Sequence, residues 1–197
     1  MDAAERKNKM MDAAMKMVAE KGLDSFSVAQ AAAAANINEA LVYRDFGTKE
    51  NLLNECYMSV NKQILDLYKN EYMPAGCSNE DLFEEMCDHW HLFFECLINS
   101  GYKTLFLQQY RDSTYKMDPV MQQKAGQNDV KIVFKNIFLA YAKNKEDIDY
   151  ISTYLIDGSI LFAKRIICKE VQNDEEIYQK VWRLLSGGLR GLSLEKI

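Results

Sequence analysis

Proline is scarce in this chain, with two in 197 residues, and no apolar run approaches the ~20 residues that span a bilayer. The cysteines are five, an odd number, and form no Cys-x-x-Cys pair: Cys56, Cys77, Cys87, Cys96 and Cys168. Reduced thiols are therefore expected, and a disulfide framework is not. The first residues, MDAAERKNK, are charged and lack the apolar segment of a signal peptide. These absences predict a cytoplasmic protein with no membrane partner.

Motifs that carry chemistry are absent as well. The sequence contains no nucleotide-binding glycine loop, no nucleophile elbow, no His-Glu-x-x-His and no Glu-x-x-His pair. Cys87, His91 and Glu95 share one face of an expected helix, but they span about 12 Å along it and cannot all bind one ion. We therefore predict that the protein is not an enzyme and holds no metal or cofactor.

What is present is helical periodicity. Apolar residues make up 48% of the chain and recur at spacings of three and four through most of it. We predict an all-α protein of about nine helices. They are expected at residues 4–21, 28–34, 39–45, 48–72, 78–99, 101–114, 119–143, 146–171 and 174–189.

The stretch from Ser27 to Lys49 is the most informative part of the sequence. Ser27 and Gln30 form a capping box at the start of a small alanine-rich helix. Asn36 suits a left-handed turn, and Asn38 is a good N-cap for a second short helix. Two helices joined by a tight turn, with small side chains at the crossing, predict a helix-turn-helix whose second helix enters the DNA major groove.

The same stretch resembles the N-terminal domain of TetR-family transcriptional regulators. The family's strongest mark is a Tyr-x-x-Phe that ends the recognition helix, followed by a Lys, and here it is Tyr43-Arg44-Asp45-Phe46 and Lys49. The resemblance covers about the first 50 residues. It implies an N-terminal three-helix DNA-binding domain over residues 1–47 and a C-terminal helical ligand-binding and dimerisation bundle over residues 48–197. It also implies a ligand-responsive repressor that binds a palindromic operator as a homodimer.

The expected contacts to double-stranded DNA follow from the helix-turn-helix and from this resemblance. We expect phosphate contacts from basic and hydroxyl side chains, and base contacts from the exposed face of the second helix. These residues are Arg6, Lys7, Ser27, Asn38, Glu39, Ala40, Leu41, Tyr43, Arg44 and Lys49.

Charge works against this expectation. The whole chain carries a formal charge of −5, and residues 1–55 hold seven Lys and Arg against nine Asp and Glu, or −2. Glu39 and Asp45 lie on or beside the expected DNA face. They would either limit non-specific affinity or, in the case of Glu39, accept a hydrogen bond from a cytosine amino group. A helical dimer that binds a small molecule or protein, without operator binding, therefore remains the alternative.

Two further sets of residues are expected in the C-terminal part. The resemblance implies a pocket for an apolar or aromatic effector, and soft and aromatic side chains suit it, although at any single position ordinary core packing is the more usual role. These residues are Cys87, Trp90, His91, Phe94, Phe106, Gln109, Tyr110, Phe134, Phe138 and Tyr154. The dimer interface is expected on an apolar stripe of the last two helices, where packing on the chain's own core is the other interpretation. This stripe is Ile151, Leu155, Ser159, Phe162, Ile166, Val181, Leu184, Leu185 and Gly188.

Overall fold

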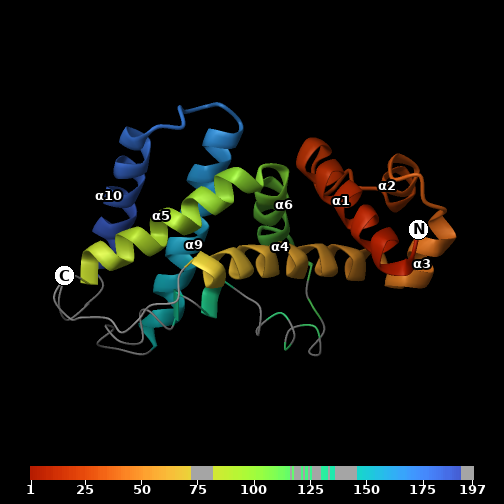
Figure 1. Ribbon diagram of the computed structural model, residues 1–197, viewed down its shortest axis with the longest axis horizontal. Helices are drawn as coiled ribbons and strands as arrows, with labels where there is room; N and C mark the ends of the chain where they lie inside the picture. The colour runs from red at the N-terminus through yellow and green to blue at the C-terminus, as the bar shows by residue number, and fades with distance from the viewer. Residues whose placement is uncertain are drawn as a thin grey trace. The chain divides into compact units, whose positions relative to one another are not determined.

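A computed structural model describes residues 1–71, 82–115 and 146–191, together with residues 117, 121, 123, 125, 130–132, 134 and 135. All the regular structure in this part of the chain is helical, which confirms the all-α prediction (Figure 1). The helices are α1 (Ala3–Lys21), α2 (Val28–Ala34), α3 (Glu39–Phe46), α4 (Lys49–Glu71), α5 (Leu82–Ser100), α6 (Tyr102–Arg111), α9 (Asp147–Ile167) and α10 (Glu175–Gly191). The predicted helix start at Ser78, most of the predicted helix at 119–143 and Phe138 lie outside the described residues.

The chain divides into two compact units. Unit 1 consists of residues 1–62 and 101–128, and unit 2 of residues 63–100 and 129–197. Unit 1 therefore holds α1, α2, α3 and α6, and unit 2 holds α5, α9 and α10, whereas α4 begins in unit 1 and ends in unit 2. No helix in the described ranges is long and apolar enough to cross a membrane.

The core of unit 1 forms where α1 meets α2 and α3. α1 begins at the N-cap Asp2, which accepts from the backbone N–H of Glu5 at 2.8 Å, and it ends at Gly22 with a φ of +89°. Met10, Ala14 and Val18 recur at helical spacing and are almost completely buried. Because α2 carries little side-chain bulk beyond its alanines, α1 packs closely against it.

The turn between α2 and α3 has the geometry that its sequence predicts. Asn36 adopts a left-handed conformation with a φ of +53°, and the side chain of Asn38 accepts from the backbone N–H of Ala40 at 2.9 Å. The capping box at α2 is only half formed. Ser27 accepts from the backbone N–H of Gln30, but the Gln30 side-chain oxygen accepts from Lys21.

Helix α6 packs on α1 within unit 1 through polar as well as apolar contacts. Tyr102 at its start donates a hydrogen bond to Asp12 of α1, and burial together with this bond raises the pKa of Tyr102 to about 12. Near its other end, Tyr110 stacks on Tyr57 of α4 and donates to Asn54 at 2.6 Å. The helix-turn-helix is thus part of a larger helical unit that includes α6.

Unit 2 is organised around one buried tryptophan. Trp90 of α5 stacks on Phe94 and on Trp182 of α10, and its indole N–H donates to Ser159 of α9 at 2.9 Å. The three helices α5, α9 and α10 all contact one another. A single aromatic side chain therefore joins every described helix that lies wholly in this unit.

Candidate nucleic-acid interface

Helix α3 has two distinct faces. Val42 and Phe46 point inward and are buried, which holds the helix on unit 1. The opposite face carries the side chains predicted to approach DNA. Asn38, Glu39, Ala40, Tyr43 and Arg44 are exposed, and Leu41 is half-buried.

Tyr43 is the most distinctive side chain on the outer face of α3. It is 47% exposed, although most large aromatic side chains of the described chain are buried. A phenol directed to solvent can donate to a phosphate oxygen. The helix that presents it is fixed at both ends, by Asn38 as N-cap and by Gly47, whose φ of +76° ends the helix.

Asp45 faces away from solvent in a close ion pair. Its two carboxylate oxygens accept from Nε and Nη2 of Arg6 at 2.6 and 3.1 Å, and the side chains are 10% and 11% exposed. The hydrogen bonds from Arg6 hold the pKa of Asp45 below its ordinary value. The acid that the sequence placed beside the DNA face is therefore neutralised inside the protein.

Two further cations expected at phosphates also have partners within unit 1. The Lys7 ammonium lies 2.9 Å from both oxygens of Glu55 and 4.8 Å from the ring centroid of Phe46. Lys49 donates to the carbonyl of Phe26 at 3.0 Å, which joins the start of α4 to the loop before α2. Each ammonium has three N–H donors, so these contacts leave donors for another acceptor.

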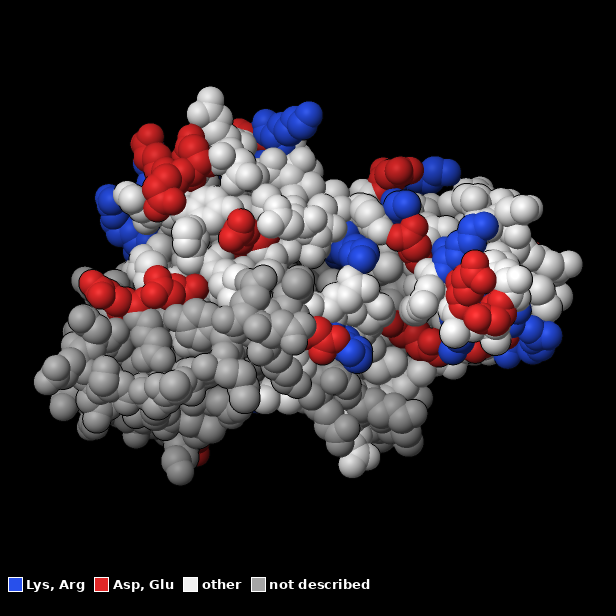
Figure 2. Space-filling view, in the orientation of Figure 1, with Lys and Arg blue, Asp and Glu red and all other residues white. Residues whose placement is uncertain are grey.

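The surface over the helix-turn-helix is of mixed charge. On the face that Figure 2 shows, acidic and basic side chains alternate over this part of unit 1. Lys9 and Arg44 are exposed cations, and Glu39 is an exposed carboxylate at the first position of α3. Such a surface favours DNA contact at particular positions over a broad electrostatic attraction.

The residues predicted for an effector pocket are divided between the two units. Phe106, Gln109 and Tyr110 belong to unit 1, where Gln109 bonds to the end of α1. The remaining described ones belong to unit 2: Cys87, Trp90, His91, Phe94, Phe134 and Tyr154. In unit 2 the aromatic residues largely pack on one another. His91 and Phe94 both meet Tyr178 edge-on, and Phe134 meets Phe93.

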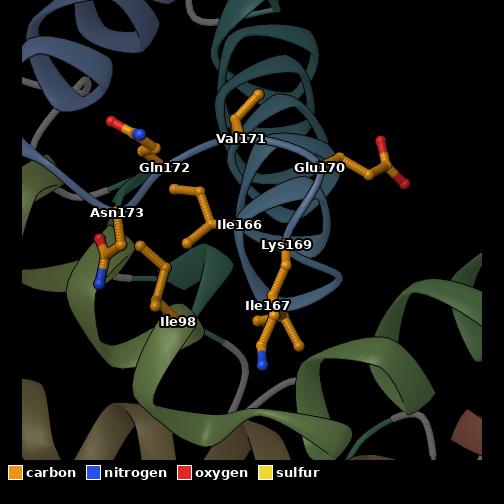
Figure 3. A pocket seen from close by; sticks show the side chains of 8 residues that line it. All are labelled: Ile98, Ile166, Ile167, Lys169, Glu170, Val171, Gln172 and Asn173. Carbon is orange, nitrogen blue, oxygen red and sulfur yellow. The ribbon is translucent and has the colours of Figure 1, made fainter.

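A surface hollow of about 610 Å³ lies elsewhere in unit 2 (Figure 3). Its lining residues come from the end of α5, the end of α9 and the loop that follows α9. They are Ile98, Ile166, Ile167, Lys169, Glu170, Val171, Gln172 and Asn173. Of these lining residues, only Ile166 was among the residues predicted from the sequence, and it was predicted as part of the dimer interface. Nothing in the helical pattern distinguishes a loop that borders a hollow from one that does not.

Most of the predicted dimer stripe is buried within the protomer. Ile151, Leu155, Ser159, Ile166, Val181 and Leu185 are at most 6% exposed and have little surface to offer a second chain. Phe162 is half-buried, whereas Leu184 and Gly188 are exposed. The apolar side chains exposed on these two helices are instead Tyr150, Tyr154, Leu161 and Leu184.

Sequence reasoning missed Glu55 and the true partners of Arg6 and Lys7. Arg6 and Asp45 are 39 positions apart, and Lys7 and Glu55 are 48 apart. Opposite charges at such distances give no periodic signal. Only the packing of α1 against α3 brings the first pair together.

The geometry defines one compact unit that contains a helix-turn-helix and a second compact unit that is helical throughout its described part. Comparison with known proteins bears on the first of these units. Residues 10–56 match the family of bacterial regulatory proteins called the tetR family. These residues therefore form the N-terminal DNA-binding domain typical of that family. No curated protein matches the sequence significantly.

Solved structures share the fold over nearly the whole chain. One is a candidate tetR-family transcription regulator of Shewanella sp. PV-4, with 15% identity, a TM-score of 0.73, and coverage of 93% of this chain and 97% of that one. Another is LfrR of Mycobacterium smegmatis in complex with proflavine, with 15% identity, a TM-score of 0.69, and coverage of 95% and 98%. A third is the fatty acid degradation regulator FadR of Bacillus halodurans, with 18% identity, a TM-score of 0.68, and coverage of 94% and 96%.

Proposed function

We propose that the protein is a cytoplasmic, non-enzymatic, ligand-responsive transcriptional repressor that binds a palindromic operator as a homodimer. The observation that carries the proposal is the two-faced α3. Its apolar side is buried in unit 1, and its polar side is exposed to solvent. α3 is the second helix of the helix-turn-helix. This is the arrangement with which such proteins enter the major groove.

The proposed contacts to DNA fall into two groups. Tyr43, Lys49 and Lys7 contact phosphates, with Ser27 at the start of α2 beside them. Asn38, Glu39, Ala40, Leu41 and Arg44 approach base edges, where the half-buried Leu41 suits a thymine methyl group. Lys7 and Lys49 keep free N–H donors beside their internal partners. Arg6 is given a different role below.

The proposed dimer forms through an exposed apolar face of α9 and α10. Tyr150, Tyr154 and Leu161 are spaced by four and seven residues, so they share one face of α9, and they are between 41% and 76% exposed. Tyr154 lies beside α10, where its hydroxyl donates to the carbonyl of Leu184. Exposed aromatic and leucine side chains on adjacent helices are typical of a protein interface.

A charge placed on this face tests the dimer. Leu184 is 61% exposed, so Leu184→Glu should leave the protomer folded and yet yield monomers in analytical ultracentrifugation. Gln179→Glu places the same charge at another exposed position of α10 and should leave the dimer intact. A dimer that withstands Leu184→Glu would place the interface elsewhere.

The effector is proposed to be apolar or aromatic and to bind in the C-terminal part of the chain. The aromatic content of α5 and its neighbours in unit 2 supports this chemistry. LfrR, which has the same fold, was solved with proflavine. A ligand regulates only if it binds the DNA-competent and DNA-incompetent dimers with different affinity.

The decisive experiment is selection of the purified protein against randomised duplex DNA at moderate salt. Enrichment of a palindrome with half-sites about one turn, ~34 Å, apart would support the proposal. Tyr43→Ala and Lys49→Ala should each weaken binding to the enriched duplex. A folded dimer that enriches no sequence would instead indicate the alternative, a small-molecule or protein-binding module without operator binding.

A further inference from the structure

The first turns of α1 hold the C-terminal end of α3. Arg6 donates through two of its nitrogens to both carboxylate oxygens of Asp45, the second-to-last residue of α3. The next residue, Lys7, pairs with Glu55 of α4 and lies over the ring of Phe46. Two successive cations of α1 thus engage the end of α3 and the helix that follows it.

We propose that Arg6 is a positioning residue for DNA binding. Its guanidinium fixes the orientation of α3 through Asp45 and does not itself contact a phosphate. The proposal rests on the DNA-binding function proposed above. It concerns a pair that the helix-turn-helix motif does not specify, because Arg6 lies 39 positions before Asp45 and outside the two helices of the motif.

The short length of α3 explains why the Arg6–Asp45 pair matters. α3 has eight residues and buries only Val42 and Phe46. A helix this short is marginal by itself, so its orientation depends on the contacts that its ends make. Near the N-terminal end of α3, these contacts come from the buried Ile37 and the Asn38 cap. At the C-terminal end they come from the Arg6–Asp45 pair.

The geometry of the pair argues against a phosphate contact by Arg6. The side chain is 11% exposed, and its Nε and Nη2 edge is already used by the carboxylate in a two-point interaction. If Arg6 turned to a phosphate, Asp45 would keep only the 3.4 Å contact from Arg44, a residue on the exposed face. A poorly neutralised carboxylate would then lie beside the DNA.

Charge and position can be separated by substitution in the full-length protein. Arg6→Lys keeps the charge but loses the planar two-point geometry, and Asp45→Asn removes a negative charge beside the DNA face. If the pair positions α3, both variants should bind the enriched duplex about tenfold more weakly, the scale of one lost base contact. The dependence of log affinity on log salt concentration should keep the wild-type slope, because no phosphate contact is lost.

Lys9→Gln is the matched control, because Lys9 is an exposed cation of the same helix. It should leave the orientation of α3 unchanged. The proposal is overturned if Asp45→Asn strengthens binding. It is also overturned if Arg6→Lys binds like the wild type while Arg6→Gln lowers the salt slope by about 0.9, the signature of one lost phosphate contact.

A second measurement separates failure of this inference from failure of the proposed function. Amide hydrogen exchange of the free protein should rise in residues 39–46 of Arg6→Lys, while residues 28–34 of α2 keep wild-type protection. If the wild type enriches no duplex but shows this pattern, the DNA-binding function fails and the positioning of α3 by Arg6 stands. Unchanged protection of α3 would overturn the positioning role, whatever the protein binds.

Discussion

The side-chain oxygen of Gln109 accepts a hydrogen bond from the backbone N–H of Leu23 at 2.8 Å, just beyond the end of α1. The side-chain nitrogen of the same residue donates to the carbonyl of Val18 at 3.0 Å. Gln109 therefore joins α6 to the C-terminal end of α1 within unit 1. In this structure both polar atoms of the Gln109 amide have backbone partners, and the effector contact expected for this residue stays a prediction.

Gln109→Leu should destabilise unit 1. The substitution keeps similar bulk but leaves the Leu23 N–H without its partner, which costs roughly 1–3 kcal/mol. Urea unfolding followed by circular dichroism measures this loss. Gln108→Leu is the control, because the Gln108 side chain has no hydrogen-bond partner among the described residues. Equal stability of the two variants would show that the Gln109 bonds contribute nothing.

Ser159→Ala should lower the stability of the protomer and leave dimerisation unaffected. Ser159 is fully buried and accepts from the indole N–H of Trp90, so its loss leaves a buried donor unpaired at a cost of roughly 1–3 kcal/mol. Ser152→Ala is a close control, because Ser152 is equally buried on the same helix and bonds only to its own helix at Ile148. Thermal unfolding and sedimentation separate the effects. A weaker dimer in Ser159→Ala would return this residue to the interface.

Gly158 and Gly187 should respond oppositely to alanine. A Cβ at Gly158 of α9 would lie 2.5 Å from Cδ2 of Leu185, a buried residue of α10. Because this side chain has little room to move, Gly158→Ala should destabilise unit 2 by about 1–3 kcal/mol. A Cβ at Gly187 would meet no atom within 4 Å. Gly187→Ala should therefore stabilise α10 by roughly 0.5–1 kcal/mol. Chemical unfolding of both variants tests the assignment, which fails if the signs are reversed.

Glu39→Gln should strengthen binding to duplexes of any sequence. Glu39 is an exposed carboxylate at the start of α3 and carries no partner among the described residues, so on DNA it repels phosphates. A gain of about two- to fivefold in affinity for random duplex is expected, with a stability cost of a few tenths of a kcal/mol because the acid favours the helix N-terminus. Fluorescence anisotropy measures the affinity. Loss of preference at one base pair would instead show that Glu39 reads a cytosine.

Local signals in the sequence were sufficient for the helix-turn-helix. Asn36, Asn38 and Gly47 act on the backbone of their own neighbourhood, and the structure places each in the predicted turn or cap. The long helices α1, α4 and α10 also lie within two residues of their predicted bounds, whereas α9 ends at Ile167 and not at residue 171 as predicted. These are the features that short-range physics determines.

The sequence could not determine which apolar face meets the chain's own core. On α9 the stripe through Ile151 and Leu155 and the stripe through Tyr150 and Tyr154 are one residue apart, and both are apolar. Only packing against α5 and α10 buries the first and leaves the second exposed. Most residues of the predicted interface lie on the stripe that the protomer buries, and their part in a dimer stays a prediction. The same limit applies to Arg6, whose carboxylate partner is 39 positions away.

The Arg6–Asp45 pair should give unit 1 a characteristic acid sensitivity. Since the hydrogen bonds from Arg6 lower the pKa of Asp45 in the folded protein, ionised Asp45 stabilises the folded state. This contribution is fully present above the ordinary aspartate pKa of about 3.9, and it is lost as the pH falls through the lower folded-state value. Asp45→Asn should therefore unfold at lower urea than the wild type at neutral pH.

The gap between the two urea midpoints should stay constant from neutral pH down to about pH 5 and close below about pH 4. Urea titrations of both proteins across this pH range test the prediction. The other carboxylates are common to the two proteins, so their effect on the midpoint cancels in the difference. Asp24→Asn, at an exposed position in the loop between α1 and α2, should show no comparable gap. A gap that widens as the pH falls would mean that protonated Asp45 is the stabilising form, and the ion pair would not hold α3 in solution.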